Sequence, residues 1–115
     1  MMPTVLITEP TSISEIRAMG EELFGDMVKA VVDVHKEAIA VGGELHADEE
    51  AFLIARNSRQ ENLWGINIFT EREDADRIEF DSMINIRPRQ NNRSRSVEDP
   101  NIREAIVRIV QRLVR

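Results

Sequence analysis

The alternation of apolar and polar residues constrains the fold of this chain more than any other feature. It runs through residues 27–34, 63–70 and 77–87. A period of two places successive apolar side chains on one face of a β-strand. The stretch 77–87 shows this pattern most clearly, and the proline that follows it is typical of a strand end. We therefore predict strands at all three stretches and a fourth in the β-branched run at residues 4–8.

Residues 27–45 fit two kinds of secondary structure, because their apolar residues also match a helical period. Valine is frequent there, and its branched side chain lowers helix propensity. We therefore favour a hairpin with a turn at residues 35–37 over a helix. Its second strand, residues 38–45, is expected to point Ile39 and Leu45 inward.

Capping signals predict three helices. Ser12, with Glu15 three residues later, forms a capping box for the first helix. Asp48 is the expected N-cap of a second helix that continues to about residue 57. Asp99 followed by Pro100 is a strong start for the last helix, because proline suits the first helical position.

The elements follow the order strand-helix-strand-strand-helix-strand-strand-helix, without βαβ regularity, repeats or a linker. This order predicts one α+β domain over residues 1–115. We expect a mostly antiparallel sheet of four to five strands with three helices packed on one face. The other face of the sheet would then be polar or covered by a partner.

The composition excludes several classes of protein. The net charge of −6, from 15 basic and 21 acidic residues, argues against general binding to nucleic acids or anionic membranes. Without cysteine, disulfides and thiolate chemistry are excluded. No apolar run approaches the roughly 18 residues of a membrane span, and the first ten residues lack the features of a signal peptide. We expect a cytoplasmic protein without a cofactor.

Five segments of the chain resemble a family of short, uncharacterised bacterial proteins that is grouped as a domain of unknown function. They are GELHADEE (43–50), QENLWGIN (60–67), IEFDSMINIRP (78–88), NRSR (92–95) and VEDPNIR (97–103). The resemblance extends from about Leu6 to Leu113. It implies a free-standing bacterial protein of one domain. It implies no activity, so there are no catalytic residues to transfer.

The first candidate site is the outward face of the strand at 77–87 and its neighbour at 63–70. Alternation places Asp81, Asn85 and Arg87 on the same face as Asn67, and Asp33 would join them if the hairpin pairs alongside. Acidic, amide and guanidinium groups that converge on a sheet could bind a polar ligand. The alternative is that they form only the wet side of a one-sided sheet.

The second candidate site is the arginine loop, residues 87–95. Its polar side chains suited to phosphate include Arg87, Arg89, Arg93, Ser94 and Arg95. Guanidinium groups bind phosphate in a bidentate manner, so the loop predicts binding of a nucleotide, RNA or another phosphate-bearing molecule. The alternative is a solvated loop, or one whose arginines pair with the protein's own acids.

The third candidate site is a metal or acid-base site at His46 and Asp48, with Glu49 and His35 as further partners. Two histidines cannot form a three-histidine zinc site, so carboxylates would have to complete the ligand set. The alternative is a histidine that hydrogen-bonds to the backbone at a helix start, where the helix dipole lowers its pKa.

These features favour a non-enzymatic binding or regulatory module, because no catalytic motif is recognisable. It would form a homodimer or bind a protein partner through the uncovered face of the sheet, or through Trp64 if that residue is exposed. The alternative function is a binder or enzyme that acts on a phosphate-bearing ligand, a nucleotide or RNA, through the arginine loop. No membrane is expected among the partners.

Overall fold

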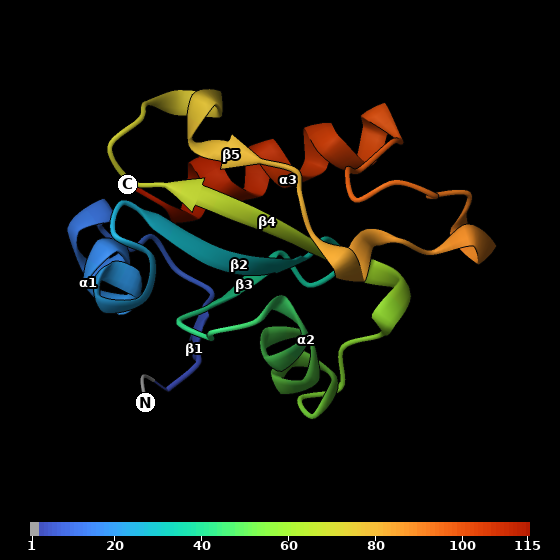
Figure 1. The fold of residues 1–115 in the computed structure, drawn as a ribbon, viewed down its shortest axis with the longest axis horizontal. Helices are drawn as coiled ribbons and strands as arrows, with labels where there is room; N and C mark the ends of the chain where they lie inside the picture. Colours follow the sequence, from blue (N-terminus) through green and yellow to red (C-terminus); the bar gives the residue numbers. More distant parts are fainter. Residues whose placement is uncertain (1–2) are drawn as a thin grey trace.

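The computed structural model describes residues 3–115, except the side chains of residues 22 and 23. Within this part of the chain, five antiparallel strands form one sheet in the order β1-β3-β2-β4-β5. The strands are β1 (Val5–Ile7), β2 (Met27–Asp33), β3 (Ala38–Val41), β4 (Leu63–Phe69) and β5 (Ile78–Glu79). The helices are α1 (Ile13–Phe24), α2 (His46–Ile54) and α3 (Pro100–Leu113). Figure 1 shows this arrangement, and it confirms the predicted α+β class and element order.

The hairpin of β2 and β3 confirms the prediction that residues 27–45 are extended. Val32 pairs with Ile39, which is fully buried, and Glu37 takes a positive φ in the turn. The predicted strand 38–45 is too long, because the chain leaves the sheet after Val41. Leu45 is therefore 56% exposed instead of pointing inward.

The two faces of the sheet are covered by different helices. Ile16 of α1 and Ile106 and Leu113 of α3 join the main core against the Trp64 face of β4. Leu53 of α2 packs with Val31, Ala40 and Leu63 on the opposite face. The three helices were predicted correctly, but their predicted packing on a single face of the sheet was wrong. The protein covers part of the second face with its own helix α2, because β2 and β3 carry apolar residues on both sides.

The predicted strand at 77–87 was wrong beyond its first residues, since β5 contains only Ile78 and Glu79. The chain then turns through the 3-10 helix η3 (Met83–Asn85), which Ser82 caps by accepting a hydrogen bond from the Ile84 backbone N–H at 3.2 Å. Serine and asparagine compete with strand pairing in this way, because their side chains bond the nearby backbone. A second 3-10 helix, η4 (Pro88–Gln90), follows.

The first and last helices begin where their caps predict. The Ser12 hydroxyl accepts a hydrogen bond from the Glu15 N–H, and the Asp99 carboxylate accepts one from the Asn101 N–H. The second helix is present, but its predicted N-cap, Asp48, was wrong, because α2 begins at His46 and Leu45 is its N-cap without a side-chain hydrogen bond. No helix in the described part of the chain is long and apolar enough to span a membrane.

Candidate functional site

A polar cleft of about 420 Å³ lies on the α2 face of the sheet, where α2 leaves β2, β4 and β5 uncovered. Its polar side chains come from five parts of the chain: β2, α2, β4, β5 with the turn after it, and the arginine loop. They are Lys29, His46, Asn67, Glu79, Asp81, Ser82 and Arg95. The structure therefore brings together members of all three predicted sites: Asn67 and Asp81 from the sheet, Arg95 from the arginine loop and His46 from the metal site. We call this the His46 cleft.

Strand register forms the floor of the His46 cleft. Asn67 on β4 pairs directly with Lys29 on β2 and with Glu79 on β5. Directly opposite residues of antiparallel strands place their Cβ atoms about 4.5–5.5 Å apart on the same face. The floor is therefore a transverse row with a cation, a carboxamide and a carboxylate in that order.

Asn67 lies at the centre of this row and is only 6% exposed. Its side-chain nitrogen donates to Glu79 Oε1 at 2.8 Å and to the Asp81 carbonyl oxygen at 3.3 Å. Its Oδ1 atom is buried and has no hydrogen-bond partner among the described residues. A buried acceptor without a partner carries a free-energy penalty of about 1–3 kcal/mol, which a donor from a ligand would remove.

His46 borders the cleft at the first residue of α2. Its Nε2 atom lies 2.8 Å from the Ile66 carbonyl oxygen. Because a carbonyl can only accept, Nε2 carries the proton and the titrating nitrogen is Nδ1. Burial lowers the pKa of His46 most, and the positive charge of Lys29 lowers it further. The hydrogen bond to the Ile66 carbonyl raises it, as do, to a smaller extent, the charge of Asp81 and the hydrogen bond that a protonated ring would make with the Asn67 side chain. The ring is therefore neutral at pH 7.

Asp81 and Arg95 form an ion pair at the edge of the cleft. Arg95 Nε donates to Asp81 Oδ1 at 2.6 Å, and both side chains are more than two-fifths exposed. Arg95 Nη1 also lies 3.7 Å from the Met83 sulfur atom. The ion pair leaves one guanidinium of the arginine loop at the cleft, where a carboxylate of the same chain balances its charge.

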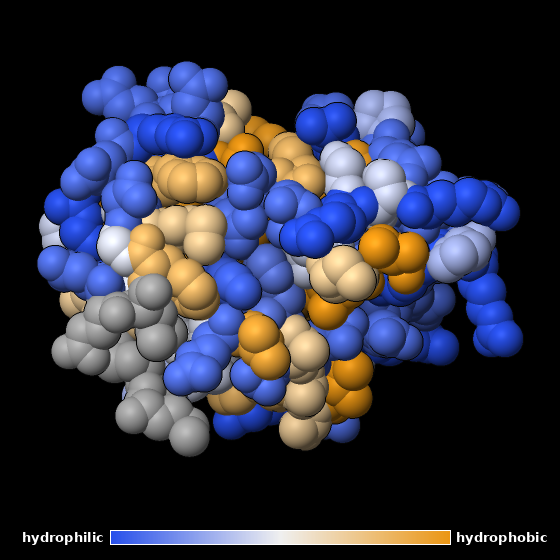
Figure 2. Space-filling view, viewed as in Figure 1, coloured by the Kyte–Doolittle hydropathy of each residue, from blue (hydrophilic) through white to orange (hydrophobic). Residues whose placement is uncertain are grey.

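Apolar side chains form the rim of the cleft. They are Met27, Leu45, Ala47, Met83 and Ile84. Met83 is 65% exposed and Leu45 is 56% exposed. Figure 2 shows the side of the molecule that carries α2, where small hydrophobic patches near the centre lie among hydrophilic residues. The cleft therefore has a polar floor and an apolar rim, as ligand pockets commonly do.

Asn85 and Arg87, two predicted site residues, have structural roles instead. Asn85 is completely buried and bonds the backbone of Gly65 with both ends of its amide. Arg87 donates to the carbonyl oxygens of Gln60 and Leu63, and its guanidinium lies 4.1 Å from the centre of the Trp64 ring. Burial lowers the pKa of Arg87. The expectation that these side chains point outward from the sheet was therefore wrong.

The arginine loop does not gather its guanidinium groups into one site. Arg87 is half-buried, Arg95 pairs with Asp81, and Arg89 and Arg93 lie exposed. The backbone N–H groups of Arg93 and Ser94 both donate to Glu98 Oε2 at 2.8 Å, and these bonds lower the pKa of that carboxyl. The chain's own carboxylate therefore occupies the place where these N–H groups could hold an anion.

Two further predicted contacts do not form around these sites. Asp33 accepts hydrogen bonds from His35 and Lys36 in the β2–β3 turn and from Ser58, so it does not join Asn67. Trp64 is 1% exposed, so it cannot form a dimer contact.

The metal ligands predicted at His46 do not converge. His46 is buried while Asp48 is exposed, and His35 lies exposed in the turn. Among residues 3–115, no three histidine, aspartate or glutamate side chains gather in a way that could hold a metal ion. The hydrogen bond from His46 to Ile66 instead matches the alternative in which this histidine bonds the backbone at a helix start.

Glu49, the last of the residues predicted for the metal site, is a buried acid on α2. It is fully buried, and its Oε2 atom accepts a hydrogen bond from the Gly43 N–H at 3.0 Å. Its other oxygen has no partner among the described residues. Burial raises the pKa of Glu49 to about 9, so the group is protonated at neutral pH.

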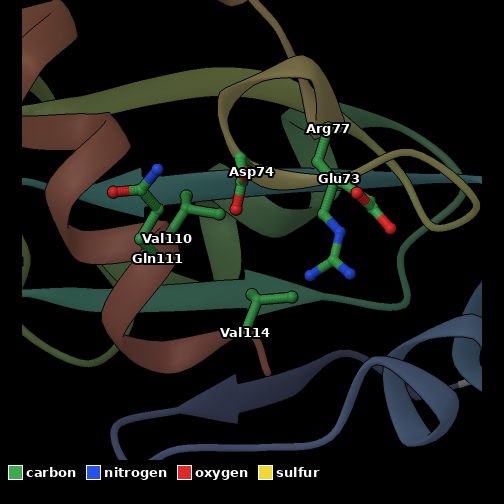
Figure 3. A pocket seen from close by; sticks show the side chains of 6 residues that line it. All are labelled: Glu73, Asp74, Arg77, Val110, Gln111 and Val114. Carbon is green, nitrogen blue, oxygen red and sulfur yellow. The ribbon is translucent and has the colours of Figure 1, made fainter.

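A second cleft of about 420 Å³ lies between the 3-10 helix η2 (Asp74–Arg77) and the end of α3. Figure 3 shows its side chains, with Asp74 beside Val110 and the Arg77 side chain extending toward Val114. Arg77 Nε already donates to the Arg72 carbonyl oxygen at 2.6 Å. No buried polar atom without a partner lines this cleft in the described structure, so the His46 cleft is the stronger candidate.

Sequence reasoning missed Lys29, Glu79 and Met83 as residues of the site. The alternation of β2 and β4 could have placed Lys29 on the face of Asn67, and Glu79 has the same parity as Asp81. What the sequence could not provide is the register that makes Lys29 and Glu79 the direct neighbours of Asn67.

The fold and the His46 cleft define a small α+β protein with a polar-floored pocket beside the first turn of a helix. The comparison with family models adds that residues 5–113 match the family described as a protein of unknown function (DUF5674). The chain therefore belongs to this family, which confirms the expected membership in a family of unknown function. No curated protein and no solved structure matched the chain.

Proposed function

We propose that this protein is a binding module that holds a small molecule in the His46 cleft. The observation that carries this proposal is the unpartnered Oδ1 atom of Asn67, buried at the centre of the cleft floor. Protein interiors rarely leave a buried acceptor unpaired, and such groups in a pocket often meet their partner in a ligand.

The surroundings of Asn67 support binding more than catalysis. The titratable groups nearest to it are already engaged: Glu79 accepts from Asn67, and Asp81 accepts from Arg95. His46 holds one ring nitrogen against the Ile66 carbonyl. These contacts fix the shape of the cleft and supply groups that can recognise a ligand. None of them pairs a nucleophile with a base.

The two partners expected from the sequence remain predictions. A protein partner or a second copy of the chain would cover the rim of the cleft, where Leu45 and Met83 are exposed. A phosphate-bearing ligand would have to use Arg89 and Arg93, because Arg87 and Arg95 bond groups of the protein itself.

A thermal-shift screen with small metabolites tests the proposed function. A ligand at one hundred times its Kd stabilises a folded protein by about 2.7 kcal/mol, which is readily measured. We expect at least one compound to raise the melting temperature of the wild type and of the Arg93→Ala variant, but not that of Asn67→Leu. A screen in which every stabilising compound acts equally on Asn67→Leu would contradict the proposal.

A further inference from the structure

The orientation of the Asn67 side chain is fixed by its neighbours. Both groups that contact its Nδ2 atom, the Glu79 carboxylate and the Asp81 carbonyl, can only accept hydrogen bonds. The nitrogen must therefore point toward β5. The Oδ1 atom consequently points to the side of β2, where Lys29 is the cross-strand neighbour of Asn67.

His46 adds a second acceptor to the same cleft. Because Nε2 donates to the Ile66 carbonyl, the neutral ring carries its lone pair on Nδ1. Only a protonated ring could donate to the Asn67 side chain, so beside the neutral ring Asn67 Oδ1 has no donor among the described residues, and His46 Nδ1 is a second acceptor. A ligand that satisfies them has to bring donor groups, N–H or O–H.

The charges that face His46 decide between a neutral and a cationic donor. Lys29 from β2 and Arg95 from the arginine loop are positive, while Glu79 and Asp81 beside β5 and Asp48 on α2 are acidic. Glu49 on α2 is protonated, and Arg95 and Asp81 neutralise each other. Burial and Lys29 both disfavour a positive charge on the ring, as the lowered pKa of His46 shows. An uncharged donor therefore fits better than an ammonium group.

The rim of the cleft describes the rest of the ligand. Met27, Leu45, Met83 and Ile84 provide aliphatic and thioether surface, and among the described residues no phenylalanine, tyrosine or tryptophan lines the cleft. The cleft therefore lacks the large aromatic ring on which a nucleobase usually stacks. Flexible methionine side chains adapt instead to aliphatic groups of varied shape.

From these observations we propose, building on the function proposed above, that the His46 cleft takes a small uncharged aliphatic molecule with an N–H or O–H donor. A primary carboxamide is the simplest example. Its NH₂ group faces Asn67 Oδ1 and His46 Nδ1, its carbonyl oxygen accepts from Lys29, and its alkyl chain lies against Met83 and Leu45. The cleft therefore selects an uncharged donor group, and a primary carboxamide provides one with two N–H bonds.

Three matched probes test the proposal on the intact, ¹⁵N-labelled protein at pH 7.5. They are butyramide, its N,N-dimethyl derivative without N–H bonds, and butylammonium, which carries a charge. Binding is followed through the side-chain NH₂ signals of Asn67 and the backbone signals of β2 and β4. We expect butyramide to bind at least tenfold more tightly than either other probe, because only it fills both acceptors without adding charge.

The comparison uses the wild-type protein, so it does not depend on whether a variant folds. Asn67→Leu should abolish the preference for butyramide over its dimethyl derivative, whereas Arg93→Ala should retain it. Equal binding of butyramide and the dimethyl derivative, or tighter binding of butylammonium, would overturn the inference. The thermal-shift screen can still find metabolites whose stabilising effect is lost in Asn67→Leu. In that case the proposed function stands and only the ligand class is wrong. Absence of any binding in both experiments would overturn both.

Discussion

The side-chain amide of Asn85 pairs with both backbone groups of Gly65. The Gly65 N–H donates to Asn85 Oδ1 at 2.8 Å, and Asn85 Nδ2 donates to the Gly65 carbonyl oxygen at 2.9 Å. The same nitrogen bonds the Arg95 carbonyl oxygen at 3.0 Å. One side chain thus replaces a paired strand beside β4 and ties the arginine loop to the wall of the His46 cleft.

Replacing Asn85 should destabilise the whole domain. Asn85→Leu removes three hydrogen bonds and leaves the buried N–H and carbonyl of Gly65 unpaired, so we expect a loss of about 2–4 kcal/mol in the free energy of unfolding. Urea denaturation measures this loss, with Asn101→Ala as a control at an exposed amide on α3. A loss below about 0.5 kcal/mol would show that Gly65 finds other partners.

The arginines of the loop should differ in their contribution to stability. Arg87→Ala removes hydrogen bonds to two carbonyl groups and the contact with Trp64, and we expect a loss of about 2 kcal/mol. Arg89→Ala and Arg93→Ala should each change stability by less than about 0.5 kcal/mol, because both side chains are exposed. Thermal melts of the three variants provide the comparison. Similar losses in all three would mean that the loop acts as one cluster.

Glu49 should make the protein less stable as the pH rises. The pKa of this carboxyl group is 4.5 as a model value and about 9 in the folded protein. The folded state thus holds a proton that the unfolded state releases, and stability falls as the pH rises from the lower value to the higher one. At about 1.36 kcal/mol for each pKa unit, the free energy of unfolding at pH 7 is lower by roughly 3 kcal/mol than it is in acid, where Glu49 is protonated in both states.

Glu49→Gln tests this directly, because glutamine imitates the protonated acid and can still accept from the Gly43 N–H. We expect the variant to be more stable than the wild type at pH 8 and to lose most of the pH dependence between pH 5 and 9. Unfolding curves at four pH values measure it. Asp48→Asn on the exposed side of α2 provides the matched control. Parallel pH profiles for Glu49→Gln and the wild type would refute the prediction.

Ligand binding in the cleft should weaken in acid. The pKa of His46 lies below its ordinary value of 6.5 because of burial. As the pH falls through that pKa, Nδ1 gains a proton, and the acceptor is replaced by a positive donor. Binding of a donor ligand should therefore be constant above about pH 7 and decline below the His46 pKa, which ¹⁵N-detected titration of the ring measures. Affinity that stays level through that titration would show that Nδ1 takes no part.

The fold was predictable where one local signal decided the outcome. The valine-rich hairpin of β2 and β3 and the helices capped by Ser12 and Asp99 follow from patterns of period and capping. The strand at 77–87 failed because its alternation competes with bonds between side chains and the backbone. Ser82 Oγ accepts from the nearby Ile84 N–H, and Asn85 bonds the backbone of Gly65, which requires β4 to be adjacent.

The candidate site was predictable residue by residue but not as a unit. Asn67, Asp81, His46 and Arg95 stood out for their chemistry, yet they belonged to three separate hypotheses. The turn after β5 brings Asp81 to Arg95, and the early start of α2 brings His46 over β4. Both contacts depend on the tertiary structure, and the sequence around each residue does not predict them.

The position of the binding site is tested most directly by mapping ¹⁵N–¹H shift changes as the most stabilising small molecule of the screen is added. The account predicts that the largest changes fall on the Asn67 side-chain NH₂ and on the backbone of Lys29 and Ala47, all at the His46 cleft. Changes confined to residues 88–93 of the arginine loop, with Asn67 unaffected, would contradict it.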